Sequence, residues 1–329
     1  MKKLAAILGA ATLALLPLSG CGGDNLTKLK ICEVTHSVFY APLYLADSLG
    51  YFKEEGLKIQ LTNGGGADSV MASVLSGNTD IGFCGPEAAI YVAIGDTKDQ
   101  PTVFAQLTKR DGSFLVSRKE EPNFKWTDLK GKELLIGRRG GVPAMTFEYV
   151  LKENGFTSSE MNINYGVEFN FMTAAFAEGT GDYCTMFEPT ASEFQASGKG
   201  YIVASVGEES GVVPYTGFIA KRSWLNKYDD RARGFVRAML KAVEYTQTHE
   251  AAEIASHIMG HFPDASLESM TVSIANYKKI DSWFTDLAMP EESFTRLQDI
   301  IDSAGELSQR VEFSKVVDNK YVIEEYAKL

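Results

Sequence analysis

Short apolar runs alternate with amphipathic segments along residues 28 to about 225. Leu29–Val34, Leu57–Leu61 and Asp80–Phe83 predict strands, because their apolar side chains are continuous or alternate over a few residues. Pro42–Leu49 and Asp68–Leu75 carry apolar residues at three- and four-residue spacing, which predicts helices. Such alternation of strand and helix favours an α/β fold with a mostly parallel sheet.

The alternation repeats in a second unit, with a helix at Pro143–Asn154 and strands at Tyr183–Phe187 and Tyr201–Val206. The run through Gly77 and Asp80 is echoed by the run through Gly179 and Asp182: a glycine ends a helix, an aspartate opens a strand, and a proline starts the next helix. We therefore predict two lobes of one plan. Lobe 1 would comprise residues 28–111 and 217–329, and lobe 2 residues 112–216, with crossings near 108–114 and 213–219.

From Ser223 onward the pattern is helical. The predicted helices are Ala232–His249, Ala251–Met259, Leu267–Phe284 and Glu291–Ala304. The aromatic residues of this tail, Trp224, Tyr245, Trp283 and Phe284, are expected to pack in the core, because aromatic residues at helical spacing usually do so.

The N-terminus has the pattern of an export signal. Lys2 and Lys3 precede the apolar stretch Leu4–Leu16, which is too short to span a bilayer, and Leu18-Ser19-Gly20-Cys21 follows. A cysteine at this exit predicts removal of residues 1–20, lipidation of Cys21 and a tether over residues 21–27, which would hold the protein at the cell envelope. The alternative is an ordinary cleaved signal with an incidental cysteine.

Composition narrows the function classes. The formal net charge of −11 argues against binding to nucleic acid. Besides Cys21 only three cysteines occur, and Cys84 and Cys184 either form one bridge or serve as small buried strand residues, the commoner use. No closely spaced His and Cys set, Walker loop, GxGxxG run or Ser-His-Asp pattern is legible, so no metal, no cofactor and no catalytic residue is predicted.

The candidate binding residues follow the strands, because ligands of open α/β sheets lie beyond the carboxyl ends of the strands. Glycine-rich turns before helices present free amides that favour an anionic or strongly accepting group, although such glycines also occur in plain turns. The candidates are His36, Ser37, Phe39, Tyr40, Gly65, Gly66, Ala67, Gly85, Pro86, Glu87, Gly141, Pro143, Phe187, Glu188 and Tyr215.

Two carboxylates, one histidine and several aromatic rings among these candidates bear on which kind of ligand the protein binds. Glu188 ends an apolar strand, where its charge needs a donor from either the ligand or the backbone amides of the next helix. Glu87 fits a helix-start residue better than a ligand contact, and His36 fits a structural and a ligand-binding histidine equally. The aromatic residues each pack more often than they bind, but together they favour a flat ligand.

Four stretches resemble a known family. His36–Ala46, the run Gly50-Tyr51-Phe52-Lys53-Glu54-Glu55-Gly56-Leu57, and Leu75–Gly82 resemble bacterial solute-binding proteins of the nitrate, sulfonate, taurine and thiamine-precursor importers, and Asp128–Lys132 resembles that family's entry to the second lobe. The resemblance implies a periplasmic-binding-protein-like fold of type II, with two α/β lobes joined by two crossover strands. It also implies a monomer that traps a small solute and docks on a membrane permease driven by a cytoplasmic ATPase.

The identity of the solute depends on the carboxylate. Glu188 would repel an anion, whereas a carboxylate beside aromatic rings suits an aminopyrimidine, so a thiamine-pyrimidine precursor or a similar flat nitrogenous compound is expected. An alkanesulfonate, taurine or nitrate bound by the glycine-turn amides with Arg138 and Arg139 is the alternative. A pyrimidine synthase of thiamine biosynthesis resembles this fold, but its cysteine-rich motif is missing here, so an enzyme is not expected. A sensor without transport is a third class.

Overall fold

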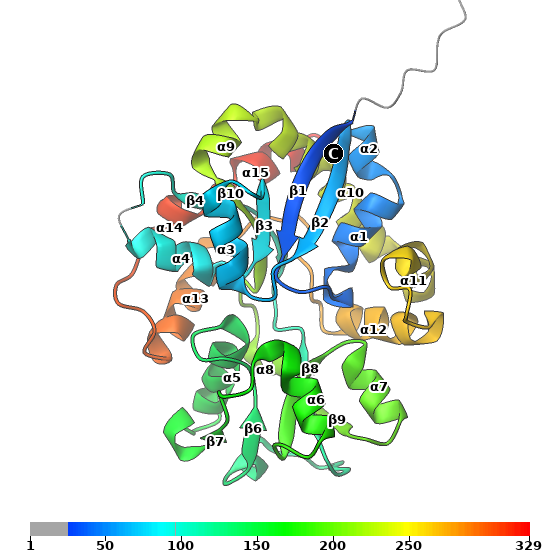
Figure 1. The fold of residues 1–329 in the computed structure, drawn as a ribbon, viewed down its shortest axis with the longest axis vertical. Coiled ribbons are helices and arrows are strands. Elements are labelled where there is room, and N and C mark those ends of the chain that lie inside the picture. The colour runs from blue at the N-terminus through cyan, green and yellow to red at the C-terminus, as the bar shows by residue number, and fades with distance from the viewer. Residues whose placement is uncertain (1–25, 96) are drawn as a thin grey trace, which may run out of the picture.

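The computed structural model describes residues 26–95 and 97–329, so the predicted leader, Cys21 and most of the tether lie outside the described residues. The described strands form two five-stranded sheets, one in each lobe (Figure 1). The first has the order β2-β1-β3-β10-β4 and contains β1 (Thr27–Glu33), β2 (Leu57–Asn63), β3 (Ile81–Cys84), β4 (Pro101–Thr108) and β10 (Thr216–Lys221). The second has the order β7-β6-β8-β5-β9 and contains β5 (Ser113–Ser117), β6 (Glu133–Leu135), β7 (Asn162–Ile163), β8 (Tyr183–Phe187) and β9 (Tyr201–Ser205).

Each sheet has one strand that opposes the other four. In the first sheet β10 runs antiparallel to β3 and β4, and in the second β5 runs antiparallel to β8 and β9. Both are strands that the chain enters after crossing from the other sheet, through residues 109–112 and 206–215. The fold class predicted from the sequence, two α/β lobes with mostly parallel sheets and two crossings, is confirmed.

The internal echo corresponds to a matched structural unit. Asp80 accepts a hydrogen bond from the backbone N–H of Lys30 at 2.9 Å, and Asp182 accepts one from the N–H of Glu133 at 2.9 Å. Each aspartate thus ties the start of its strand to the neighbouring parallel strand. Glu188 directly follows the second of these strands, whereas Glu87 lies three residues beyond the end of the first and after Pro86.

The helices cover the faces of the sheets. Those before the first crossing are η1 (Val38–Tyr40), α1 (Ala41–Ser48), α2 (Tyr51–Glu54), α3 (Ala67–Ser76) and α4 (Glu87–Ile94). Those of the second lobe are η2 (Trp126–Leu129), α5 (Val142–Glu153), η3 (Ser158–Glu160), η4 (Phe169–Phe171), α6 (Met172–Ala177), α7 (Thr190–Ala196) and α8 (Val206–Ser210). The tail forms α9 (Arg222–Lys227), α10 (Asp229–Thr248), α11 (Ala251–Ile258), η5 (Met259–His261), α12 (Leu267–Lys279), α13 (Glu291–Ser303), α14 (Phe313–Val316) and α15 (Lys320–Tyr326).

The tail contacts both lobes. Helix α10 packs on α1, α2 and α15, whereas α12 contacts α7 and α13 contacts α5, both in the second lobe. Figure 1 shows α12 and α13 at the level between the two lobes. The tail therefore brings side chains to the junction of the lobes.

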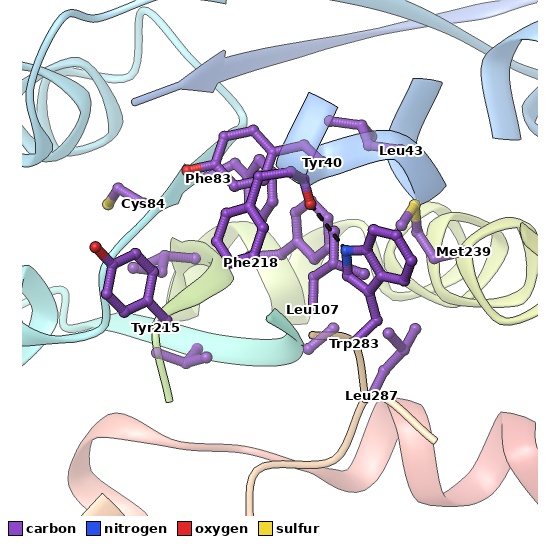
Figure 2. Packing of buried hydrophobic residues seen from close by; sticks show 14 of the residues in the cluster. Tyr40, Leu43, Phe83, Cys84, Leu107, Tyr215, Phe218, Met239, Trp283 and Leu287 are labelled. Atoms are coloured by element: carbon purple, nitrogen blue, oxygen red, sulfur yellow. Dashed lines mark hydrogen bonds between the residues drawn. The ribbon is translucent and has the colours of Figure 1, made fainter. Parts of the chain in front are cut away.

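The predicted helix over Leu267–Phe284 is wrong in its last turn, because α12 ends at Lys279. Asp281 has a φ of 53°, which is incompatible with a continuing right-handed helix. Trp283 instead bridges to Thr108 in β4 and donates its indole Nε1–H to the carbonyl oxygen of Phe39 at 2.8 Å (Figure 2). The expectation that Trp283 and Phe284 pack in the core is confirmed, because both are buried.

The three cysteines of the described chain, Cys32, Cys84 and Cys184, are buried free thiols, so Cys84 and Cys184 do not pair. In the parts that the structure describes, none of the helices combines the length and the apolar character needed to cross a bilayer.

Candidate functional site

A cleft of about 410 Å³ lies between the lobes and is lined by loops of both. Ten predicted residues line it: Tyr40, Gly65, Gly66, Ala67, Gly85, Glu87, Gly141, Pro143, Phe187 and Tyr215. Most of them come from the carboxyl ends of strands and the first turns of α3, α4 and α5, as expected for an open α/β sheet, whereas Tyr40 lies in η1 and Tyr215 directly precedes the antiparallel strand β10. The volume falls within the range of small-molecule sites.

Glycines let the backbone approach the cleft. Gly66 precedes α3 and Gly141 precedes α5, and neither helix start has a side-chain cap. The first-turn amides of these two helices, one in each lobe, therefore border the same cleft. Gly85 makes room for Glu87, because a Cβ at position 85 would lie 1.9 Å from the Glu87 Oε2 atom. The Glu87 side chain is therefore folded back over Gly85 at the wall of the cleft.

Glu87 is a buried carboxyl group whose Oε2 atom has no hydrogen-bond partner among the described residues, and its side chain is 3 % exposed. Burial raises the pKa of Glu87 to about 7, while the nearby backbone amides of Glu87, Ala88 and Val142 and the charge of Arg138 act in the opposite direction. Val142 belongs to the second lobe, so this carboxyl lies where the two lobes face each other. A ligand that donates a hydrogen bond here would satisfy an otherwise unpaired acceptor.

An ion pair crosses the mouth of the cleft. The guanidinium Nη2 of Arg138, in the second lobe, lies 3.0 Å from Oδ1 of Asp68 in α3 of the first lobe. Both side chains are substantially exposed, at 46 % and 69 %, so solvent screens the pair. The ion pair is therefore a weak contact that a ligand or an opening motion can exchange.

Aromatic rings form the walls. Phe187 lies 5.8 Å from Phe169 and 6.4 Å from Tyr215, measured between ring centroids, and all three line the cleft. Tyr40 packs edge-on against Phe83 at 4.4 Å, so one part of its ring belongs to the core (Figure 2). Phe169 was not among the predicted residues, because it lies in a single 3-10 turn that leaves no periodic signal in the sequence.

Other lining residues were also missed by the prediction. These are Val34, Thr35, Asp68, Ser69, Gly137, Arg138, Val142, Glu168 and Thr216. Thr35, Asp68, Val142 and Thr216 directly neighbour a predicted residue, and the sequence offers Arg138 only as a charge for an anionic ligand. The sequence signal for these residues is their place next to a glycine turn or a strand end. This place alone does not show whether a side chain points into the cleft or away from it.

A second, smaller cavity of about 190 Å³ adjoins the cleft and shares Thr35, Phe169 and Phe187 with it. Of the predicted residues, His36, Ser37 and Glu188 line this cavity together with Phe187. The cavity is further lined by Met172, Thr173, Thr185, Met186, Pro189 and Thr190.

His36 is held by protein groups on both ring nitrogens. Its Nδ1 lies 2.7 Å from Oε1 of Glu33, and its Nε2 lies 2.9 Å from the carbonyl oxygen of His261. Since both partners accept hydrogen bonds, the doubly protonated ring is favoured, and the bond to Glu33 raises the pKa of His36. The hydroxyl of Tyr44 also donates to Glu33, at 2.6 Å. His36 thus has the structural role that the sequence left open.

Glu188 also finds its donors within the protein. Its carboxylate accepts bonds from the backbone N–H and the hydroxyl of Ser192, at 3.0 and 2.7 Å, and from Nδ2 of Asn276 at 2.6 Å. Its own N–H donates to the hydroxyl of Tyr277 at 2.9 Å. Ser192 lies in the first turn of α7, and Asn276 and Tyr277 lie in α12. The alternative of a carboxylate satisfied within the fold therefore describes Glu188.

Two predicted residues lie away from both cavities. Phe39 is fully buried among the rings of Tyr40, Phe187, Tyr215 and Tyr277, so it belongs to the core that supports the cleft and not to its wall. Pro86 precedes α4 and lines neither cavity. Both placements have the same reason: a strand-end loop has one face toward the cleft and one toward the core.

Across residues 26–95 and 97–329, no group of three or more His, Cys, Asp and Glu side chains is arranged to hold a metal ion.

Comparisons with known proteins place the chain in a family. The family model described as "NMT1/THI5 like" matches residues 38–252. The "Putative binding protein YtlA" of Bacillus subtilis (strain 168) is 44% identical over 302 residues, which cover 92% of this chain and 90% of that protein. The 4-amino-5-hydroxymethyl-2-methylpyrimidine phosphate synthase of Aspergillus parasiticus is 26% identical over 247 residues, 71% of this chain and 70% of the enzyme.

A solved structure agrees in fold. The periplasmic nitrate-binding protein NrtA from Synechocystis PCC 6803 superposes with a TM-score of 0.76 at 15% sequence identity, covering 92% of this chain and 89% of that one. The family match spans well over half of the chain, and the sequence resemblance noted above is confirmed. The chain therefore belongs to the NMT1/THI5-like family.

Proposed function

We propose that this protein is the exported solute-binding component of an importer driven by ATP hydrolysis, and that it captures a small organic solute between its two lobes. The similarity to a binding protein over nearly the whole chain and the two-lobed fold support this class. The cleft supports it as well, because residues of both lobes line it and a ligand there would contact both. Closure around the ligand would then create the form that a membrane permease recognises.

We propose a flat nitrogenous ring with an amino group as the ligand, of the kind found in a pyrimidine precursor of thiamine. The observation that carries this proposal is the buried Glu87 carboxyl, whose Oε2 atom lacks a partner among the described residues at the wall of the cleft. Glu87 takes the role that the sequence suggested for Glu188. Phe187 and Tyr215 provide apolar faces for the ring.

The test is calorimetric titration of the purified protein at pH 8 with 4-amino-5-hydroxymethyl-2-methylpyrimidine, with taurine as the competitor. We expect the pyrimidine to bind, and Glu87→Gln to weaken it more than about tenfold, the scale of a hydrogen bond to a charged group. Glu168→Gln is the matched control, because Glu168 lines the same cleft but is exposed to solvent, and it should change the affinity less than about twofold. Equal affinity of the Glu87→Gln variant would remove this carboxyl from recognition.

An anion such as nitrate or an alkanesulfonate is the second candidate. The amides before α3 and α5, together with Arg138, favour a negative group in the cleft. Binding of taurine without binding of the pyrimidine would support this candidate and leave Glu87 with a structural role.

The fungal synthase in the comparison shares part of the sequence, and we propose binding without catalysis for this chain. His36 and Ser37 both line the second cavity, but the two ring nitrogens of His36 are bonded to Glu33 and to the carbonyl oxygen of His261, and neither is bonded to Ser37. Conversion of the pyrimidine during titration would contradict the proposal, and product analysis by mass spectrometry would detect it.

We also propose attachment of the mature chain to the membrane through lipid on Cys21, with the protein acting as a monomer next to its permease and ATPase. The export pattern of residues 1–21 supports the anchor. The short polar stretch before β1 supplies the tether that lets the lobes reach the permease.

A further inference from the structure

We propose that the smaller cavity is a second subsite of the same binding site and takes a neutral polar arm of the ligand, such as a hydroxymethyl group. The inference rests on the proposed function, because it assumes that a ring occupies the larger cleft. It goes beyond that function by naming a second part of the ligand, outside the ring, that the protein would recognise.

The first observation is that the two cavities adjoin. Thr35, Phe169 and Phe187 line both of them, and the two phenyl rings meet edge to face with centroids 5.8 Å apart. A ring lying against Phe187 in the larger cleft therefore has the second cavity beside it. A short substituent reaches that cavity without displacing the ring.

The second observation is the hydroxyl lining. Thr173 in α6, Thr190 at the start of α7 and Thr35 after β1 contribute side chains to the cavity, and within the described chain their hydroxyls form no hydrogen bond. A threonine hydroxyl both donates and accepts. Three such groups around about 190 Å³ match a small group that does the same, and a hydroxyl is the simplest example.

The charges of the wall favour a neutral arm. The carboxylate of Glu188 already accepts three bonds from Ser192 and Asn276, and it would repel a second negative group nearby. His36 is compensated by the carboxylate of Glu33, so it offers no free positive charge to an anion. The fixed charges are thus paired internally, and the groups left for a ligand are the neutral hydroxyls.

The experiment compares two pyrimidines that differ only in the arm: 4-amino-5-hydroxymethyl-2-methylpyrimidine and 4-amino-2,5-dimethylpyrimidine. We expect the unmodified protein to bind the hydroxymethyl compound at least fivefold more tightly in calorimetry. The double variant Thr173→Val/Thr190→Val, which keeps the side-chain shape, should lose this preference while its affinity for the dimethyl compound stays within twofold. Thr146→Val is the matched control, because Thr146 is a buried threonine of the same lobe outside both cavities.

The outcomes separate the inference from the proposed function. Binding of both pyrimidines with equal affinity by the unmodified protein overturns the second subsite and leaves the ring assignment intact, and it would mean that water alone fills the cavity. Binding of neither compound overturns both. Since the comparison of the two compounds needs no variant, the test stands even if the double variant fails to fold.

Discussion

The buried carboxyl of Glu87 has a measurable consequence for stability before any ligand is added. Burial raises the pKa of Glu87 from its ordinary 4.5 to about 7. The folded protein therefore holds a proton that the unfolded chain has released between these two values, and stability falls as the pH rises through this window. Each pH unit between these two pKa values corresponds to roughly 1.4 kcal/mol, so burial of the ionised carboxylate lowers the free energy of unfolding by about 3 kcal/mol above pH 7.

The perturbation is Glu87→Gln, which keeps the shape of the side chain and removes its titration. At pH 4.5 both proteins carry a neutral group at this position, so their free energies of unfolding should be similar. At pH 8.5 the variant should be more stable than the unmodified protein by up to about 3 kcal/mol, since it avoids the cost of burying a charge.

The assay is guanidinium-induced unfolding of both proteins at pH 4.5, 6, 7 and 8.5, followed by tryptophan fluorescence. Burial also raises the pKa of Asp111, to about 6, but this group titrates in both proteins and cancels from their difference. The reasoning predicts a difference that grows between pH 4.5 and about 7 and is constant above it. A difference that does not depend on pH, or one that favours the unmodified protein at pH 8.5, would refute it and show that the charge is paired by Arg138.

Two further predictions rest on contacts of the fold and a third rests on the N-terminal sequence. Glu188→Gln should destabilise the protein by about 1–3 kcal/mol in the same unfolding assay, because its amide nitrogen would oppose the donors of Ser192; an unchanged free energy would mean that these bonds are not made. Gly207→Ala should prevent stable folding, since a Cβ there would lie 2.1 Å from the carbonyl oxygen of Asp111, and a normal circular-dichroism melting curve would contradict that packing. Cys21→Ala should move the protein from the membrane fraction to the soluble fraction on blots of fractionated cells, and retention in the membrane would argue against the anchor.

Much of the fold was predictable because its signals are local. The spacing of apolar residues in Leu57–Leu61 and Tyr183–Phe187 is sufficient to identify β2 and β8, with the bounds of β8 exact. The similar short motifs around Asp80 and Asp182 indicated two lobes with the same arrangement of elements. The reason is that in each lobe the aspartate before a strand accepts a hydrogen bond from the backbone of the neighbouring strand. The last turn predicted for α12 failed, since Trp283 gains more from packing under β4 than from continuing the helix.

The order of residues along the chain is enough to place a carboxylate after one strand of each lobe, Glu87 in one and Glu188 in the other, next to glycine turns and aromatic residues. Which of the two keeps an oxygen without a hydrogen-bond partner depends on how the helices pack. Asn276 lies 88 residues from Glu188 in the chain, and α12 carries it to the junction of the lobes to satisfy that carboxylate. The described chain brings no comparable donor to Oε2 of Glu87. Whether a carboxylate is bonded within the protein depends on donors that are distant in the sequence, so no local sequence pattern could have distinguished Glu87 from Glu188.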